Sequence, residues 1–204
     1  ERFPEAELKE LSGGFGILRV PEDEVPEILG LKEIEYAEKP KRLFFAINQA
    51  EAASCLTQVQ QGPEGLTGRG VLVGILDSGI DYFHGDFRHE DGASRILFLK
   101  DQVTGSVYTK EEIDEALRTG SREAARALVA YESDILAVRL GTPEPDGFPR
   151  TTQVMEGLDF LAKKSMELGR PMAVNVSFGN SYGSHDGTEL LERFMDSLAL
   201  MGRM

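Results

Sequence analysis

An acidic residue ends an apolar segment of the chain and is followed directly by a serine and a glycine. The segment reads Val71-Leu-Val-Gly-Ile-Leu-Asp77-Ser-Gly79. A short apolar run rich in branched aliphatic residues and bounded by a turn signal predicts a buried strand. Asp77 would then lie at the carboxyl end of that strand. A carboxylate held there can orient a histidine and stabilise the imidazolium that forms when a serine loses its proton. Asp77 has the residue type and the predicted position for this chemistry.

The residues on both sides of this strand resemble the aspartate motif of subtilisin-like serine peptidases. Gly68-Arg-Gly70 precedes the strand, and Asp81-Tyr-Phe-His-Gly-Asp-Phe87 follows it. This order is similar to the family pattern GxGVxVAVxDTGID…HPDF. The resemblance implies an α/β fold with a subtilisin-like parallel sheet flanked by helices. It also implies an Asp-His-Ser triad with Asp77 as its acid, and a protein or peptide as substrate.

The other two members of such a triad are not found in the sequence. The family's histidine segment GHGTxVA, its serine segment GTSxAxP and its GNxG segment are all absent. The histidines of the chain are His84 in the aspartate motif, His89 in a charged loop and His185 in a Gly/Ser-rich stretch. A helix-like segment runs directly into a strand at 127–133, where the family has its histidine helix. The sequence leaves three alternatives open: a piece of a longer protein, a chain from which segments were omitted, and a genuine deletion.

A second resemblance falls on Ala173-Val-Asn-Val-Ser-Phe-Gly179, which is similar to VINMSLG in the family. In the family, the backbone of the Ser-x-Gly part pairs with bound substrate as an edge strand. The resemblance therefore implies that Ser177, Phe178 and Gly179 line the substrate cleft. The alternative is a core strand that ends in a turn.

The first part of the chain forms a separate small α+β unit by its pattern. A strand, a short helix with a proline at its start and a second strand are predicted at residues 14–20, 21–29 and 32–36. The position of this unit and the run Glu35-Tyr-Ala-Glu-Lys-Pro40 resemble the N-terminal prodomain of subtilisin relatives. The resemblance implies a prodomain-like segment at 1–49 and an incomplete peptidase domain at 50–204.

The run Arg42-Leu-Phe-Phe-Ala-Ile-Asn-Gln49 is predicted to be extended. As the end of a prodomain it would lie in the chain's own cleft as an added strand, with alternate side chains in pockets. Cleavage between Gln49 and Ala50 would separate the prodomain, and 50–61 would open the peptidase domain as a helix. The alternative is that 43–47 is one more core strand.

From Gly70 onward, strands and helices alternate, which predicts a largely parallel sheet with right-handed crossovers. The predicted strands are 71–76, 95–100, 135–140 and 172–176. The predicted helices are 109–128 with a break at 120–121, 151–168 and 190–204. Thr109 and Glu112 form a capping box at one helix start, and Gly169 ends another helix.

The charge and composition of the chain exclude several classes of function. With 35 acidic and 22 basic side chains the net charge is -13, which disfavours nucleic acid and anionic membranes as partners because phosphate binding needs clustered cations. The single cysteine, Cys55, permits no internal disulfide, and no apolar run approaches the roughly 18 residues of a membrane span. The acids at 81–91 match no calcium loop, so we expect no metal and no cofactor.

Several features together resemble the Csp germination proteases and their clostridial relatives. They are Glu38-Lys-Pro40, the approach Leu66-Thr-Gly-Arg-Gly70, the Asp77 motif with Tyr82-Phe83, and the helix start Thr109-Lys-Glu-Glu-Ile113. The resemblance implies an endopeptidase that keeps its prodomain bound after autoprocessing, or a pseudoprotease that acts as a binding or regulatory protein in spore germination. It suggests a secreted or spore-associated location. A general α/β binding domain, in which Asp77 only caps a strand, is the third alternative.

Overall fold

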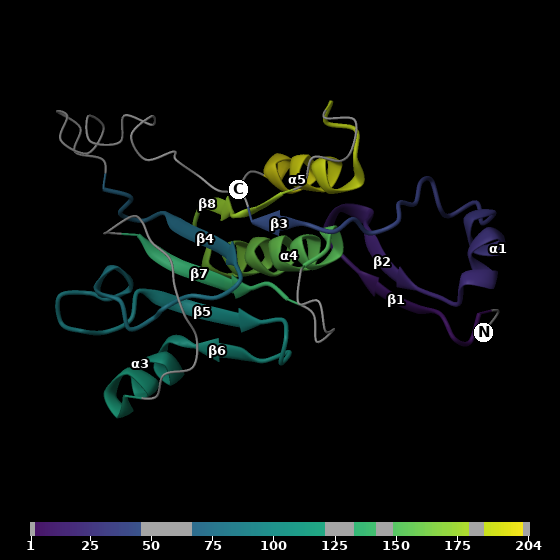
Figure 1. The fold of residues 1–204 in the computed structure, drawn as a ribbon. Coiled ribbons are helices and arrows are strands. Elements are labelled where there is room, and N and C mark those ends of the chain that lie inside the picture. The colour runs from purple at the N-terminus through teal and green to yellow at the C-terminus, as the bar shows by residue number, and fades with distance from the viewer. Residues whose placement is uncertain (1–2, 46–66, 121–132, 142–148, 180–185, 202–204) are drawn as a thin grey trace.

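The computed structural model describes residues 3–45, 67–120, 133–141, 149–179 and 186–201. A five-stranded sheet forms its centre, with helices on both faces and a small N-terminal unit to one side (Figure 1). The N-terminal unit contains β1 (Glu7–Glu10), β2 (Gly16–Arg19), α1 (Val25–Leu29) and β3 (Phe44–Phe45). The remaining strands are β4 (Leu72–Asp77), β5 (Ile96–Asp101), β6 (Val107–Thr109), β7 (Asp134–Arg139), β8 (Met172–Val176) and β9 (Phe178–Gly179). The remaining helices are α3 (Lys110–Thr119), α4 (Thr151–Leu168) and α5 (Leu190–Leu200).

The central sheet has the strand order β6-β5-β7-β4-β8. The strands β5, β7, β4 and β8 are parallel, and only the edge strand β6 runs antiparallel to its neighbour. The predicted parallel sheet flanked by helices is confirmed. The sequence analysis missed β6, which is three residues long and joins directly to α3.

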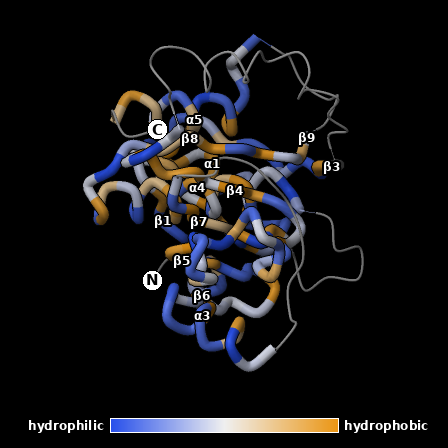
Figure 2. The backbone as a smooth tube through the Cα atoms, turned by 90° about the vertical axis from the view of Figure 1, so that its left-hand side faces the viewer, coloured by the Kyte–Doolittle hydropathy of each residue, from blue (hydrophilic) through white to orange (hydrophobic). Residues whose placement is uncertain are grey.

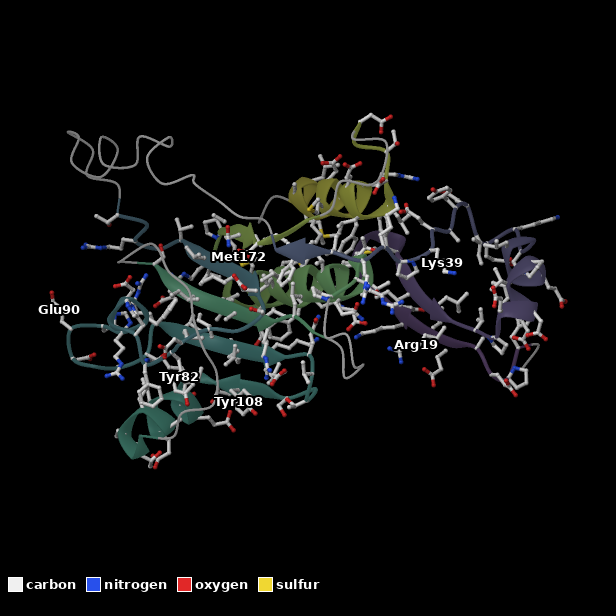
Figure 3. All side chains as sticks on the ribbon, viewed as in Figure 1. Arg19, Lys39, Tyr82, Glu90, Tyr108 and Met172 are labelled. Carbon is white, nitrogen blue, oxygen red and sulfur yellow. The ribbon has the colours of Figure 1, made fainter. Side chains whose placement is uncertain are left out.

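Each face of the sheet carries its own apolar core, which is why β7 is almost continuously apolar. Leu136 and Val138 belong to a cluster with α4 and α5, whereas Ile135 and Ala137 belong to a cluster with α3 and the loop after β4. Figure 2 shows apolar stretches where β4, β7 and β8 cross the middle of the molecule. Tyr82, from the loop after β4, lies on the α3 side (Figure 3). The buried faces hold β4 rigidly, so its carboxyl end is a fixed position.

The ends of the helices follow the predicted signals. At α3, Thr109 Oγ1 accepts from the Glu112 backbone N–H while the Glu112 carboxylate accepts from the Thr109 N–H, so the capping box is confirmed. Gly120 follows α3 with a φ of 73°, and Gly169 follows α4 with a φ of 66°. Residues other than glycine rarely adopt this left-handed backbone conformation, which is why both helices end at a glycine. None of the helices in the described part of the chain is long and apolar enough to cross a membrane.

The N-terminal unit differs from its prediction in two strands, one that is absent and one that was not predicted. The strand β2 pairs antiparallel with β1, with Glu7 opposite Arg19, and residues 32–36 form no strand. The chain after α1 is instead held in turns, with the Leu31 N–H donating to the Ile28 carbonyl and the Ile34 N–H to the Leu31 carbonyl. β1 was missed because its sequence, ELKE, has no β-branched or aromatic residue.

The N-terminal unit packs on α4 and α5. The Phe15 and Phe194 rings meet edge to face with centroids 5.2 Å apart, and Leu11 is buried in the same apolar cluster. Asp159 of α4 accepts hydrogen bonds at Oδ1 from the Ser12 backbone N–H at 2.9 Å and from Ser12 Oγ at 2.6 Å. Burial opposes ionisation of Asp159, but the hydrogen bonds from Lys163 and Ser12 outweigh it and lower the pKa of this carboxyl.

We expect a double-mutant cycle of Ser12→Ala and Asp159→Asn to give a coupling energy of about 1–2 kcal/mol in urea unfolding, because both donors act on one buried carboxylate. The folded pKa of Asp159 is lowered, so its contribution to stability is complete at neutral pH. The contribution is lost as the pH falls below the usual aspartate range, through the lowered pKa. Strictly additive single changes, or a coupling unchanged in acid, would contradict this assignment.

Candidate active site

Asp77 is the last residue of β4 and lies half-buried between two parallel neighbours. Its carbonyl accepts a hydrogen bond from the Leu140 N–H at 2.7 Å, which fixes the backbone where the strand ends. Its Oδ1 accepts from the Ser78 backbone N–H at 2.6 Å and from Ser78 Oγ at 3.2 Å. Two donors on one oxygen fix the orientation of the carboxylate.

The predicted cleft residues follow the neighbouring strand at the same edge of the sheet. Leu76 of β4 is paired with Val176 of β8, so Asp77 and Ser177 are the next residues along two adjacent parallel strands. Ser177 Oγ accepts from Asn175 Nδ2 at 2.9 Å. Ligands of open α/β sheets bind in the crevice outside the carboxyl ends of the strands, and this edge is such a place.

The strand β3 lies along the residues that follow Ser177. It forms a separate two-stranded sheet with β9, in which Phe44 is opposite Gly179 and Phe45 opposite Phe178. The pairing is antiparallel, so β3 runs toward the end of β8 and hence toward Asp77. The run predicted to be an added strand therefore contacts two of the three predicted cleft residues.

The other edge of the same run pairs with a segment that the sequence analysis did not identify. The Leu43 N–H donates to the Pro149 carbonyl at 3.0 Å, and the Thr151 N–H donates to the Lys41 carbonyl at 2.9 Å. The Lys41 N–H donates to Thr151 Oγ1 at 3.2 Å. Residues 41–45, which we call the central segment, thus lie between 149–151 and 178–179. No local signal marks 149–151 as a pairing edge, because its partner lies more than a hundred positions earlier.

The apolar side chain of Leu43 is anchored in the core. Leu43 is 3% exposed and Phe178 is 7% exposed, and both belong to the cluster beneath α4 and α5. An extended segment with hydrogen bonds on both edges and a buried side chain is the usual geometry of a peptide bound by β-augmentation.

Lys41 forms an ion-pair cluster where the central segment begins. Its Nζ lies 2.9 Å from Glu38 Oε1 and 2.7 Å from Glu189 Oε1. Hydrogen bonds to Glu189 and Glu38 raise the pKa of Lys41 to about 12. Burial opposes ionisation of Glu38, but the hydrogen bonds from Lys41 and from the Leu190 N–H lower its pKa.

Some predicted features lie outside the described residues. These are the cleavage position between Gln49 and Ala50, the helix at 50–61, His185 and residues 121–132. Among the residues that the structure describes, no three His, Cys, Asp or Glu side chains form a group that could hold a metal ion.

The comparisons with known proteins agree with this geometry. The family model of the Csp protease B prodomain matches residues 1–41. The solved structure of the Clostridium perfringens CspB protease is 34% identical, with a TM-score of 0.61 over 72% of this chain. The chain is a subtilisin-like protein related to the Csp proteases. The minor extracellular protease Vpr of Bacillus subtilis is 24% identical over 88% of the chain.

The chain spans only part of these relatives, 36% of the CspB structure and 24% of Vpr. The Csp prodomain match ends at Lys41, the first residue of the central segment. It covers β1, β2 and α1, so the unit that packs on α4 and α5 is the part similar to a Csp prodomain. The resemblance to a subtilisin-like family and the presence of an N-terminal prodomain are confirmed.

Proposed function

We propose that the full protein is a subtilisin-like serine endopeptidase in which Asp77 is the acid of an Asp-His-Ser triad. Residues 1–49 would be the prodomain and 50–204 part of the peptidase domain, with autoprocessing between Gln49 and Ala50. The backbone of Ser177, Phe178 and Gly179 would pair with the substrate. The observation that carries this proposal is the pairing of β3 with β9, directly beside the strand end that carries Asp77.

The chemistry follows from the position of the carboxylate. Ser78 holds Oδ1 of Asp77, so the histidine of the full protein would donate its Nδ1–H to Oδ2. The histidine takes the proton of the serine hydroxyl as the serine oxygen attacks the peptide carbonyl. Asp77 stabilises the resulting imidazolium, which then protonates the leaving amine and leaves an acyl-enzyme that water hydrolyses. Neither the histidine nor the serine motif is among the 204 residues, so the proposal concerns the full protein.

We propose a pseudoprotease as the second candidate, because the pairing of β3 with β9 binds an extended segment and needs no serine chemistry. In such a protein the same cleft binds a peptide or the prodomain. Binding then regulates a partner in spore germination, and no peptide bond is cleaved. Both candidates have a peptide ligand and a prodomain bound in the cleft. A secreted or spore-associated location is compatible with both, and the extracellular relative Vpr supports it.

A fluorophosphonate probe separates the two candidates. We expect the full-length protein to form one covalent adduct per chain, because an activated serine attacks phosphorus as it attacks a carbonyl. A protein that binds peptide but forms no adduct is a pseudoprotease. In the same sample, intact mass under denaturing conditions should give a prodomain fragment that ends at Gln49. A fragment ending elsewhere rejects the Gln49–Ala50 position.

A further inference from the structure

The Lys41 cluster joins the two parts of the chain that autoprocessing would separate. Glu38 and Lys41 belong to the region that matches the prodomain, whereas Glu189 is the N-cap residue of α5. Release of the prodomain would therefore remove both Glu38 and Lys41. Glu189 would stay with the peptidase domain.

Glu189 is paired with a cation at this position. Its side chain is 17% exposed, its Oε1 is buried, and Lys41 Nζ lies 2.7 Å from that oxygen. This contact is both an ion pair and the hydrogen bond that raises the pKa of Lys41. A buried carboxylate oxygen without a counter-charge is unfavourable. A peptide that replaced the central segment would leave this carboxylate without its counter-charge unless it carried a cation at the position of Lys41.

The backbone fixes which residue of that peptide meets Glu189. Thr151 makes two hydrogen bonds with the backbone of Lys41. The Lys41 N–H donates to Thr151 Oγ1, and the Lys41 carbonyl accepts from the Thr151 N–H. Leu43, two residues later, is bound by Pro149 and has its side chain in the core. A substrate in the same track therefore keeps the same spacing between the residue near Glu189 and the buried apolar residue.

We propose that Glu189 and Thr151 form a distal substrate subsite that takes a lysine or arginine side chain two residues before the apolar residue in the Leu43 position. The proposal rests on the proposed function, in which a substrate follows the track of the central segment. It assigns a specificity determinant at the start of α5, in addition to the backbone pairing at 149–151 and 178–179.

The test compares three peptides with the sequence of residues 41–45, each with a C-terminal fluorophore and with lysine, methionine or glutamate at the first position. The peptides end before the proposed cleavage position, so they report binding alone, measured by fluorescence anisotropy. The proteins are the full-length wild type, Glu189→Gln, and Glu167→Gln as a matched control on α4, where the Glu167 side chain is 59% exposed. The protein's own central segment competes equally with all three peptides, so it cancels from the ratio of their affinities.

We expect the lysine peptide to bind the wild type and Glu167→Gln about five- to tenfold more tightly than the methionine peptide, and the glutamate peptide to bind most weakly. In Glu189→Gln the ratio should fall to about one. Equal binding of the three peptides to the wild type, no binding of any of them, or an unchanged ratio in Glu189→Gln overturns the proposal. This experiment measures binding and not cleavage. Failure of the protein to react with the fluorophosphonate would therefore reject the enzymatic proposal and leave the proposed subsite in place.

Discussion

Replacing Asp77 by asparagine should lower the kcat for peptide hydrolysis by the full-length protein by about 10⁴-fold. Asparagine has the shape of aspartate and keeps the acceptor oxygen that Ser78 holds, so the strand end is preserved. It has no charge to stabilise the imidazolium, and its amide group favours the wrong tautomer of the histidine. The loss should fall on kcat and leave peptide binding in the cleft unchanged. Hydrolysis of a quenched fluorescent peptide checks the prediction.

Asp91→Asn is the matched control for this change. Asp91 lies in the loop after β4 and accepts from the Ala93 N–H at 2.9 Å, an interaction that asparagine retains. We expect its activity to stay close to that of the wild type. Nearly full activity in Asp77→Asn would exclude the triad role of Asp77. In that case the pseudoprotease, in which Asp77 does no chemistry, becomes the better description.

The parts of the fold that the sequence predicted well are those with local signals. The helix α4 has the predicted bounds, because Gly169 ends it and an apolar stripe runs along its whole length. The strands β4 and β7 were predicted to within one residue, since each is a short apolar run between polar turns. The position of Asp77 at the end of β4 followed from the same run. That Asp77 is catalytic stays a prediction.

The parts that could not be predicted depend on contacts between distant residues. The pairing of Lys41 and Leu43 with 149–151 involves an edge with no strand pattern of its own. The ion pair of Lys41 with Glu189 joins residues that lie far apart in the sequence. Neither charge spacing nor periodicity reveals such pairs, because only the fold brings them together. The segments that pair with the central segment therefore became known only from the structure.

A buried arginine fixes the loop that follows Asp77. Arg95 is 2% exposed. Its guanidinium donates two hydrogen bonds to the Ser133 carbonyl, from Nε at 3.0 Å and from Nη2 at 2.5 Å. A third hydrogen bond runs from Nη1 to the Asp86 carbonyl at 2.5 Å. Burial lowers the pKa of Arg95, and the nearby charges of Asp134 and Asp86 oppose that shift. The side chain thus ties the loop after β4 to the start of β7.

We expect Arg95→Met to lower the free energy of unfolding by about 3 kcal/mol, because it leaves the buried Ser133 carbonyl without its two guanidinium donors and removes the donor to the part-buried Asp86 carbonyl. The stability of Arg95→Lys should lie between that of the wild type and that of Arg95→Met. An ammonium keeps the charge but cannot span both carbonyls as the planar guanidinium does. Arg118→Met, on the exposed side of α3 with a side chain 70% exposed, should change stability by no more than about 0.5 kcal/mol. Urea unfolding of the full-length protein measures all three. If Arg95→Met is as stable as Arg118→Met, the guanidinium does not hold the loop, and the rigidity of the Asp77 end of the sheet must come from the apolar cluster around Ile80 and Phe87.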